Sequence, residues 1–173
     1  GSGLADNFDG TIVGVVFAPK REYADKIGSE DPMLLLTIHA NEMDPVEQAY
    51  SLGSGGMWES VRGGLEVTSR KSPDSHKFNS SSRAGTLVAY ILAGVGGGDK
   101  TKGQEVLIKR DRWMTEAEFY TGLRFHWNLV KLKTLGGEER DVLLPTSFLG
   151  EVSAVAAETS QRTEPGPPAS DLN

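Results

Sequence analysis

Residues 122–133 read Gly-Leu-Arg-Phe-His-Trp-Asn-Leu-Val-Lys-Leu-Lys, and apolar and polar side chains alternate along them. Successive residues of a strand face opposite sides of its sheet. The apolar set is Leu123, Phe125, Trp127 and Leu129, and the polar set is Arg124, His126 and Asn128. This period of two predicts a half-buried strand, with Phe125 and Trp127 facing the core.

Runs of β-branched and apolar residues predict further strands on either side of this segment. Thr11–Phe17 is one such run, and it ends before Pro19. Met33–Ala40 and Gln48–Leu52 flank the turn-forming residues 41–45, which predicts an antiparallel pair. Further extended segments are predicted at Leu65–Thr68, at Gln104–Lys109 and, after a hairpin turn at 135–138, at Arg140–Leu144 with Pro145 at its close.

One helix is predicted inside the chain, between the strand-forming segments. Ser81 or Ser82 is a suitable N-cap, and the glycines from Gly94 onward end the helix. The apolar residues at helical spacing are Leu87, Val88, Ile91, Leu92 and Val95. A second, short helix is predicted with Thr115 as its cap and Glu118 at the capping-box position.

Several short strands, an internal helix and a final hairpin predict a mainly β fold over residues 1–150. A small OB-fold-like Greek-key barrel fits this order, and a two-layer α+β sheet is the alternative architecture. Residues 151–173 contain four acidic residues, one arginine, three prolines and no aromatic residue. Such a composition buries too little apolar surface to offset the ordering entropy, which predicts a disordered acidic tail.

The charge of the chain is unevenly distributed along its 173 residues. The total is 18 basic against 24 acidic residues, a net charge of −6, which by itself argues against a nucleic-acid partner. Residues 62–133, however, carry 13 basic and 7 acidic side chains, while both flanking segments are acidic. A basic middle segment between acidic ones favours a polyanionic partner for the middle of the chain.

Several classes of protein are excluded or disfavoured by what the chain lacks. With no cysteine, disulfide frameworks and cysteine zinc sites are excluded. The longest apolar runs fall far short of a membrane span, and no secretion signal is visible, so we expect no membrane association and a location in the host-cell cytoplasm. The three histidines lie far apart in sequence, and no metal site or cofactor is predicted.

Residues 94–101, Gly-Val-Gly-Gly-Gly-Asp-Lys-Thr, differ from a phosphate-binding Walker A loop at one position, Asp99. The real motif follows a strand and opens a helix, whereas these glycines follow a predicted helix. A glycine-rich helix end is therefore favoured over a nucleotide site. No catalytic constellation is evident, so the protein is predicted not to be an enzyme.

Single-stranded nucleic acid is bound by cations that hold phosphates and by aromatic rings that stack on bases. The long polar loop Ser69–Ser82 and the segments on either side of it supply both kinds of side chain. The candidate phosphate-binding residues are Arg62, Arg70, Lys71, Lys77, Arg83, Arg110, Arg112 and Arg124. The candidate base-contacting residues are Trp58, Phe78, Trp113 and His126.

Four segments carry a resemblance to a known family, and they occur in the expected order over roughly residues 7–150. The segments are Asn-Phe-Asp-Gly-Thr-Ile at 7–12, Lys-Phe-Asn-Ser-Ser-Ser-Arg at 77–83 before the helix, Ala-Glu-Phe-Tyr-Thr-Gly-Leu at 117–123 before the alternating strand, and Leu-Leu-Pro-Thr at 143–146. In this layout the chain resembles the phage-encoded single-stranded DNA-binding proteins with an OB-fold.

The resemblance implies a non-enzymatic protein that binds single-stranded DNA in phage replication or recombination. In that family an acidic C-terminal tail recruits replication or recombination proteins, and a homo-oligomer is compatible with the sequence. The tip here, Ser-Asp-Leu-Asn at 170–173, departs from the pattern because it has one acid and no terminal aromatic residue. The alternative function is a phage virion or assembly protein that binds only protein, which glycine-rich loops and a strand-rich domain also suit.

Overall fold

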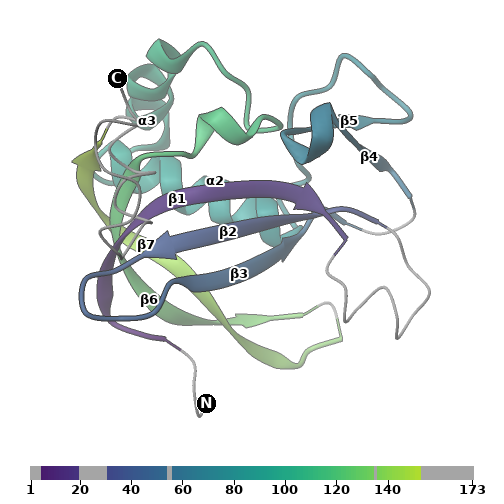
Figure 1. The fold of residues 1–173 in the computed structure, drawn as a ribbon. Helices are drawn as coiled ribbons and strands as arrows, with labels where there is room; N and C mark the ends of the chain where they lie inside the picture. Colours follow the sequence, from purple (N-terminus) through teal and green to yellow (C-terminus); the bar gives the residue numbers. More distant parts are fainter. Residues whose placement is uncertain (1–4, 20–30, 54–55, 135, 153–173) are drawn as a thin grey trace.

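The computed structural model describes residues 5–19, 31–53, 56–134 and 136–152 (Figure 1). Its strands are β1 (Phe8–Ala18), β2 (Met33–His39), β3 (Val46–Ser51), β4 (Trp58–Val61), β5 (Glu66–Ser69), β6 (Leu123–Lys133) and β7 (Glu139–Glu151). Its helices are α2 (Arg83–Val95) and α3 (Lys100–Leu107), with short 3-10 turns η1 (Arg62–Gly64), η2 (Ile108–Arg110) and η3 (Ala117–Phe119).

Five of the strands form one antiparallel sheet in the order β3-β2-β1-β6-β7, and β4 and β5 form a separate hairpin. The central strand β1 pairs with β2 through Thr11–Ala18 and with β6 through Phe8–Thr11. The prediction of a mainly β fold is therefore confirmed. The barrel is not, because the edge strands β3 and β7 do not pair with each other in the described part of the chain.

The alternating segment forms β6 as predicted, and its apolar face lies in the core. Phe125 and Trp127 are both fully buried, and their rings meet edge to face with centroids 5.7 Å apart. The indole N–H of Trp127 donates a hydrogen bond to the carbonyl oxygen of Gly10 at 3.0 Å. The polar atom of this large side chain is therefore satisfied, as burial requires.

Helix α2 packs against β7 and β3, and it lies behind the sheet in Figure 1. Ser82 is the N-cap, because its hydroxyl accepts a hydrogen bond from the N–H of Gly85 at 2.9 Å. The predicted helix and its cap are thus confirmed. Leu87 and Ile91 are fully buried, which places the apolar stripe of the helix against the sheet.

Helix α3 lies where an extended segment, Gln104–Lys109, was predicted, so that prediction is wrong. The carboxylate of Asp99 caps the helix by accepting hydrogen bonds from the N–H groups of Thr101 at 2.9 Å and Lys102 at 3.3 Å. This local capping bond starts a helix despite the polar, glycine-containing sequence.

The predicted capping box is also wrong. A single 3-10 turn, η3, replaces the second short helix, and no side chain caps it. Thr115 is buried instead, and Glu118 forms an ion pair with Arg62.

Strand β7 continues through Pro145 to Glu151, so the prediction that the strand ends at Pro145 is wrong. Pro145 lies opposite Trp127 next to a register irregularity between His126 and Trp127. An edge strand tolerates proline, since the missing N–H interrupts no ladder on its free side.

Strand β4 was not predicted. The last described strand, β7, ends at Glu151, and the division into a domain over 1–150 and a tail over 151–173 stays a prediction, because residues from 153 onward lie outside the described ones.

None of the helices described is long and apolar enough to cross a membrane.

Tyr50 links the two edge strands of the sheet across the core. Its buried hydroxyl donates a hydrogen bond to the carbonyl oxygen of Leu143, at 2.6 Å, which joins β3 to β7. Burial raises the pKa of the Tyr50 hydroxyl well above its usual range, so the group remains a donor at neutral pH.

Replacing Tyr50 by phenylalanine leaves the Leu143 carbonyl without this donor. We expect the free energy of unfolding in urea to fall by about 1–3 kcal/mol at neutral pH. The matched control is Tyr90→Phe, because the hydroxyl of Tyr90 makes no hydrogen bond within the described residues. Equal stability losses in the two variants would show that the hydroxyl of Tyr50 does not hold the edges together.

Candidate nucleic-acid interface

An exposed indole stacks on a half-buried imidazole at the surface. Trp113 is 56% exposed, and its indole lies parallel to the imidazole of His76 with centroids 4.5 Å apart and an interplanar angle of 8°. The backbone N–H of Trp113 donates to the Glu116 carboxylate at 2.8 Å, which fixes the turn that carries the indole. The outer face of such a stack offers a flat apolar surface to a third ring.

A pocket of about 490 Å³ opens beside these rings. It lies where α2, α3 and the segment 108–119 meet. Its apolar lining comes from Leu92, Leu107, Ile108, Met114 and Phe119, and its polar lining from Lys77, Thr101, Gln104, Glu105 and Arg112. We call this cavity, together with the His76–Trp113 stack at its edge, the ring pocket. Of the predicted site residues it brings together Lys77, Arg112 and Trp113.

Half of the predicted phosphate-binding cations are already engaged by carboxylates. Arg62 forms an ion pair with Glu66 at 2.8 Å and with Glu118 at 2.9 Å. These bonds raise the pKa of Arg62 and lower that of Glu118, with the hydrogen bond between the two as the main cause. The other pairs are Arg70 with Glu59 at 3.7 Å, Arg110 with Glu151 at 2.6 Å, and Arg112 with Glu116 at 3.3 Å.

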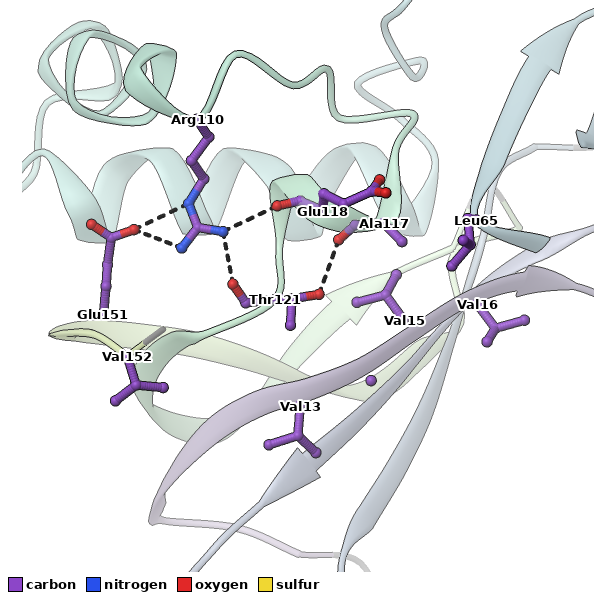
Figure 2. Close-up of a pocket in the computed structure, with 11 residues that line it drawn as sticks. Val13, Val15, Val16, Leu65, Arg110, Ala117, Glu118, Thr121, Glu151 and Val152 are labelled. Carbon is purple, nitrogen blue, oxygen red and sulfur yellow. Dashed lines mark hydrogen bonds and ion pairs between the residues drawn. The ribbon is translucent and has the colours of Figure 1, made fainter. Parts of the chain in front are cut away.

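Arg110 is the clearest correction among these cations (Figure 2). Besides Glu151, its guanidinium donates to the carbonyl oxygens of Glu118 at 3.1 Å and Thr121 at 2.7 Å. It borders a groove of about 750 Å³ along β1, where Val13, Val15 and Val16 line one wall. All these hydrogen bonds of the guanidinium join the end of β7 to the segment before β6. Arg110 is therefore a structural residue.

The remaining predicted cations, Lys71, Lys77, Arg83 and Arg124, form no ion pair with any residue that the structure describes. Lys71 and Lys77 are exposed, and Lys77 borders the ring pocket. Arg83 opens α2, directly after the loop that contains His76 and Lys77. These are the side chains whose charge is available to an anionic ligand.

Two of the predicted aromatic contacts do not fit their surroundings. Phe78 is only 7% exposed, because its ring packs between Phe17, at 6.3 Å, and Trp58, at 5.3 Å. The prediction that Phe78 stacks on a base is therefore wrong. Trp58 is half-buried and meets the ring of Phe78 in a T-shaped contact, so its indole is partly used in packing.

His126 lies on the polar face of β6, as predicted, but its ring nitrogens are engaged. Nδ1 lies 2.6 Å from Asp9 and Nε2 lies 2.8 Å from Asn7. The imidazole is thereby tied to the chain that enters β1, and only its face is left for a base. Base contact by His126 stays a prediction.

Sequence reasoning missed His76 and the side of α3 that faces the ring pocket. A lone histidine in a polar loop gives no local signal for stacking. Thr101, Gln104, Glu105 and Ile108 recur at helical spacing, but only Ile108 is apolar, so the sequence lacks the apolar stripe that predicts a helix.

The glycine-rich segment joins α2 to α3, and the Asp99 carboxylate occupies the helix N-terminus where a phosphate-binding loop would hold its ligand. Within the residues described, no cluster of three or more His, Asp or Glu side chains is arranged to hold a metal ion.

Comparisons with protein-family models, curated proteins and solved structures find no match to the chain. The function is therefore argued from the geometry of the site.

Proposed function

We propose that this protein binds single-stranded DNA without catalysing a reaction, in phage DNA replication or recombination in the host cytoplasm. The observation that carries the proposal is the stack of the exposed Trp113 on His76, beside Lys77, which forms no ion pair with any residue that the structure describes. Unpaired bases have exposed faces that stack on such rings, and their phosphates require cations nearby. In duplex DNA the base faces are stacked on one another, so binding through this aromatic stack favours single strands.

We also propose that the domain is an open form of the OB-fold, and the sheet topology supports this. β1 pairs with β2 on one side and with β6 on the other, and the helices lie between β3 and β6 in the chain. The OB-fold is a five-stranded, partly open Greek-key barrel, and many such domains bind oligonucleotides. The hydrogen bond from Tyr50 to Leu143 bridges the open side between the two edge strands.

Replacing Trp113 by alanine tests the proposal through the affinity for a labelled single-stranded oligonucleotide, measured by fluorescence anisotropy. Loss of one stacking platform is worth about 1–3 kcal/mol, so we expect Kd to rise by roughly 5- to 150-fold. The control is Leu149→Ala, which removes an exposed apolar side chain of β7 that lies outside the predicted site and should leave Kd within about twofold.

A wild-type protein that does not bind the oligonucleotide at low salt would contradict the proposal. Binding that is equally strong in the Trp113→Ala variant would remove the stack from it. The alternative of a virion or assembly protein makes a distinct prediction, since a protein-only partner leaves DNA unbound under all salt conditions.

A further inference from the structure

We propose that the ring pocket holds one unstacked nucleobase of the bound strand and prefers a base with an exocyclic amino group. This inference rests on the proposed function and deepens it, because it adds base selectivity to a site otherwise expected to bind any sequence. Three features of the pocket support it: apolar walls, an aromatic stack and a positive charge at the rim, and two polar side chains without partners among the described residues.

The walls suit a flat heterocycle. Leu107 is buried, and with Leu92, Met114 and Phe119 it supplies apolar surface on several sides. The volume of about 490 Å³ lies within the range of small-ligand pockets, which combine apolar walls with a few placed polar groups. A base that enters the pocket exchanges contact with water for contact with these side chains.

The rim of the pocket carries an aromatic stack and a positive charge, which a bound nucleotide needs for the neighbouring base and for its phosphate. The His76–Trp113 stack provides a platform at the entrance for the neighbouring base. Lys77, which has no ion-pair partner among the described residues, borders the same opening and is placed to attract the phosphate that stays in solvent. Arg112 is held by Glu116 and contributes less free charge.

Gln104 and Glu105 are the two side chains that would recognise the base by hydrogen bonding. Both lie on the pocket side of α3, and neither side chain makes a hydrogen bond or ion pair with another described residue. A carboxylate accepts from the amino group of cytosine, and a glutamine amide pairs with adenine. Thymine has carbonyl oxygens in place of an amino group, and these face a carboxylate unfavourably. The pocket should therefore discriminate against thymine.

The experiment compares three oligonucleotides of one length: an all-thymidine strand, the same strand with one central deoxycytidine, and the same strand with one central abasic site. For the full-length wild-type protein we expect the deoxycytidine strand to bind about tenfold tighter than the all-thymidine strand. In the Glu105→Gln variant this ratio should fall to about two.

The matched control is Glu139→Gln, which removes the same charge from an exposed position on β7. It should raise the affinity for all strands alike and leave the ratio near ten. Both substituted side chains are exposed, so neither change should unfold the protein, and a thermal melt checks this.

A wild-type ratio near one, with salt-sensitive binding to all three strands, overturns the base pocket and leaves the proposed function standing. A ratio near ten that Glu105→Gln leaves unchanged overturns the assignment to this pocket. Absence of binding to any strand overturns the proposed function itself.

Discussion

Replacing Trp127 by alanine is expected to lower the free energy of unfolding by about 3–5 kcal/mol. The indole is fully buried, packs edge to face on Phe125 and donates to the Gly10 carbonyl. The substitution therefore leaves a cavity at the junction of β1 and β6 and removes the donor from a buried carbonyl. Urea denaturation followed by circular dichroism measures the loss.

The same substitution at Trp113 is the natural control, because that indole is 56% exposed. We expect Trp113→Ala to change the free energy of unfolding by less than about 1 kcal/mol while it weakens DNA binding. A small effect at Trp127, or similar effects at both positions, would contradict the assignment of one tryptophan to the core and the other to the interface.

Replacing Gly103 by alanine is expected to lower the free energy of unfolding by about 2–3 kcal/mol and to weaken DNA binding as well. Gly103 is buried where α3 crosses α2, and a Cβ atom there would lie 1.9 Å from the Leu92 carbonyl oxygen. Alanine gains up to about 1 kcal/mol over glycine within a helix, but the two backbones must separate to admit it. That separation parts the opposing walls of the ring pocket.

Gly94→Ala is the matched control for this substitution. It makes the same change inside α2, where the new Cβ would meet Phe125 at an ordinary contact distance of 3.4 Å. We expect its stability to equal or exceed that of the wild type. The account of the α2–α3 contact fails if Gly103→Ala is as stable as Gly94→Ala in urea denaturation.

The parts of the fold that sequence predicts well are those set by local periodicity. The alternation over 122–133 identifies β6 and its buried face, because a period of two survives in any sheet environment. The apolar stripe of α2 is predicted from its helical period, and the cap is predicted, as Ser81 or Ser82, from the preference for serine at helix starts. Helix α3 has no apolar stripe of that kind, so the Asp99 cap is its only strong signal, and the segment was predicted as extended.

The candidate site was predicted less completely, because its features depend on contacts between distant residues. Arg110 resembles a free cation in sequence, yet its carboxylate partner Glu151 lies 41 residues further on. Phe78 sits in a polar loop but is buried against Phe17, from the first strand. Trp113 was predicted as a base contact, whereas its stacking partner His76 gave no sequence signal.

We propose that Trp113 and the nearby cations without ion-pair partners among the described residues bind single-stranded DNA. The decisive experiment is a titration of the wild-type protein with an unlabelled oligonucleotide, followed by tryptophan emission at low and high salt. We expect quenching that is lost in Trp113→Ala, and an affinity that falls as salt rises because phosphate contacts release counterions. Unchanged emission together with no salt-sensitive binding would contradict the claim.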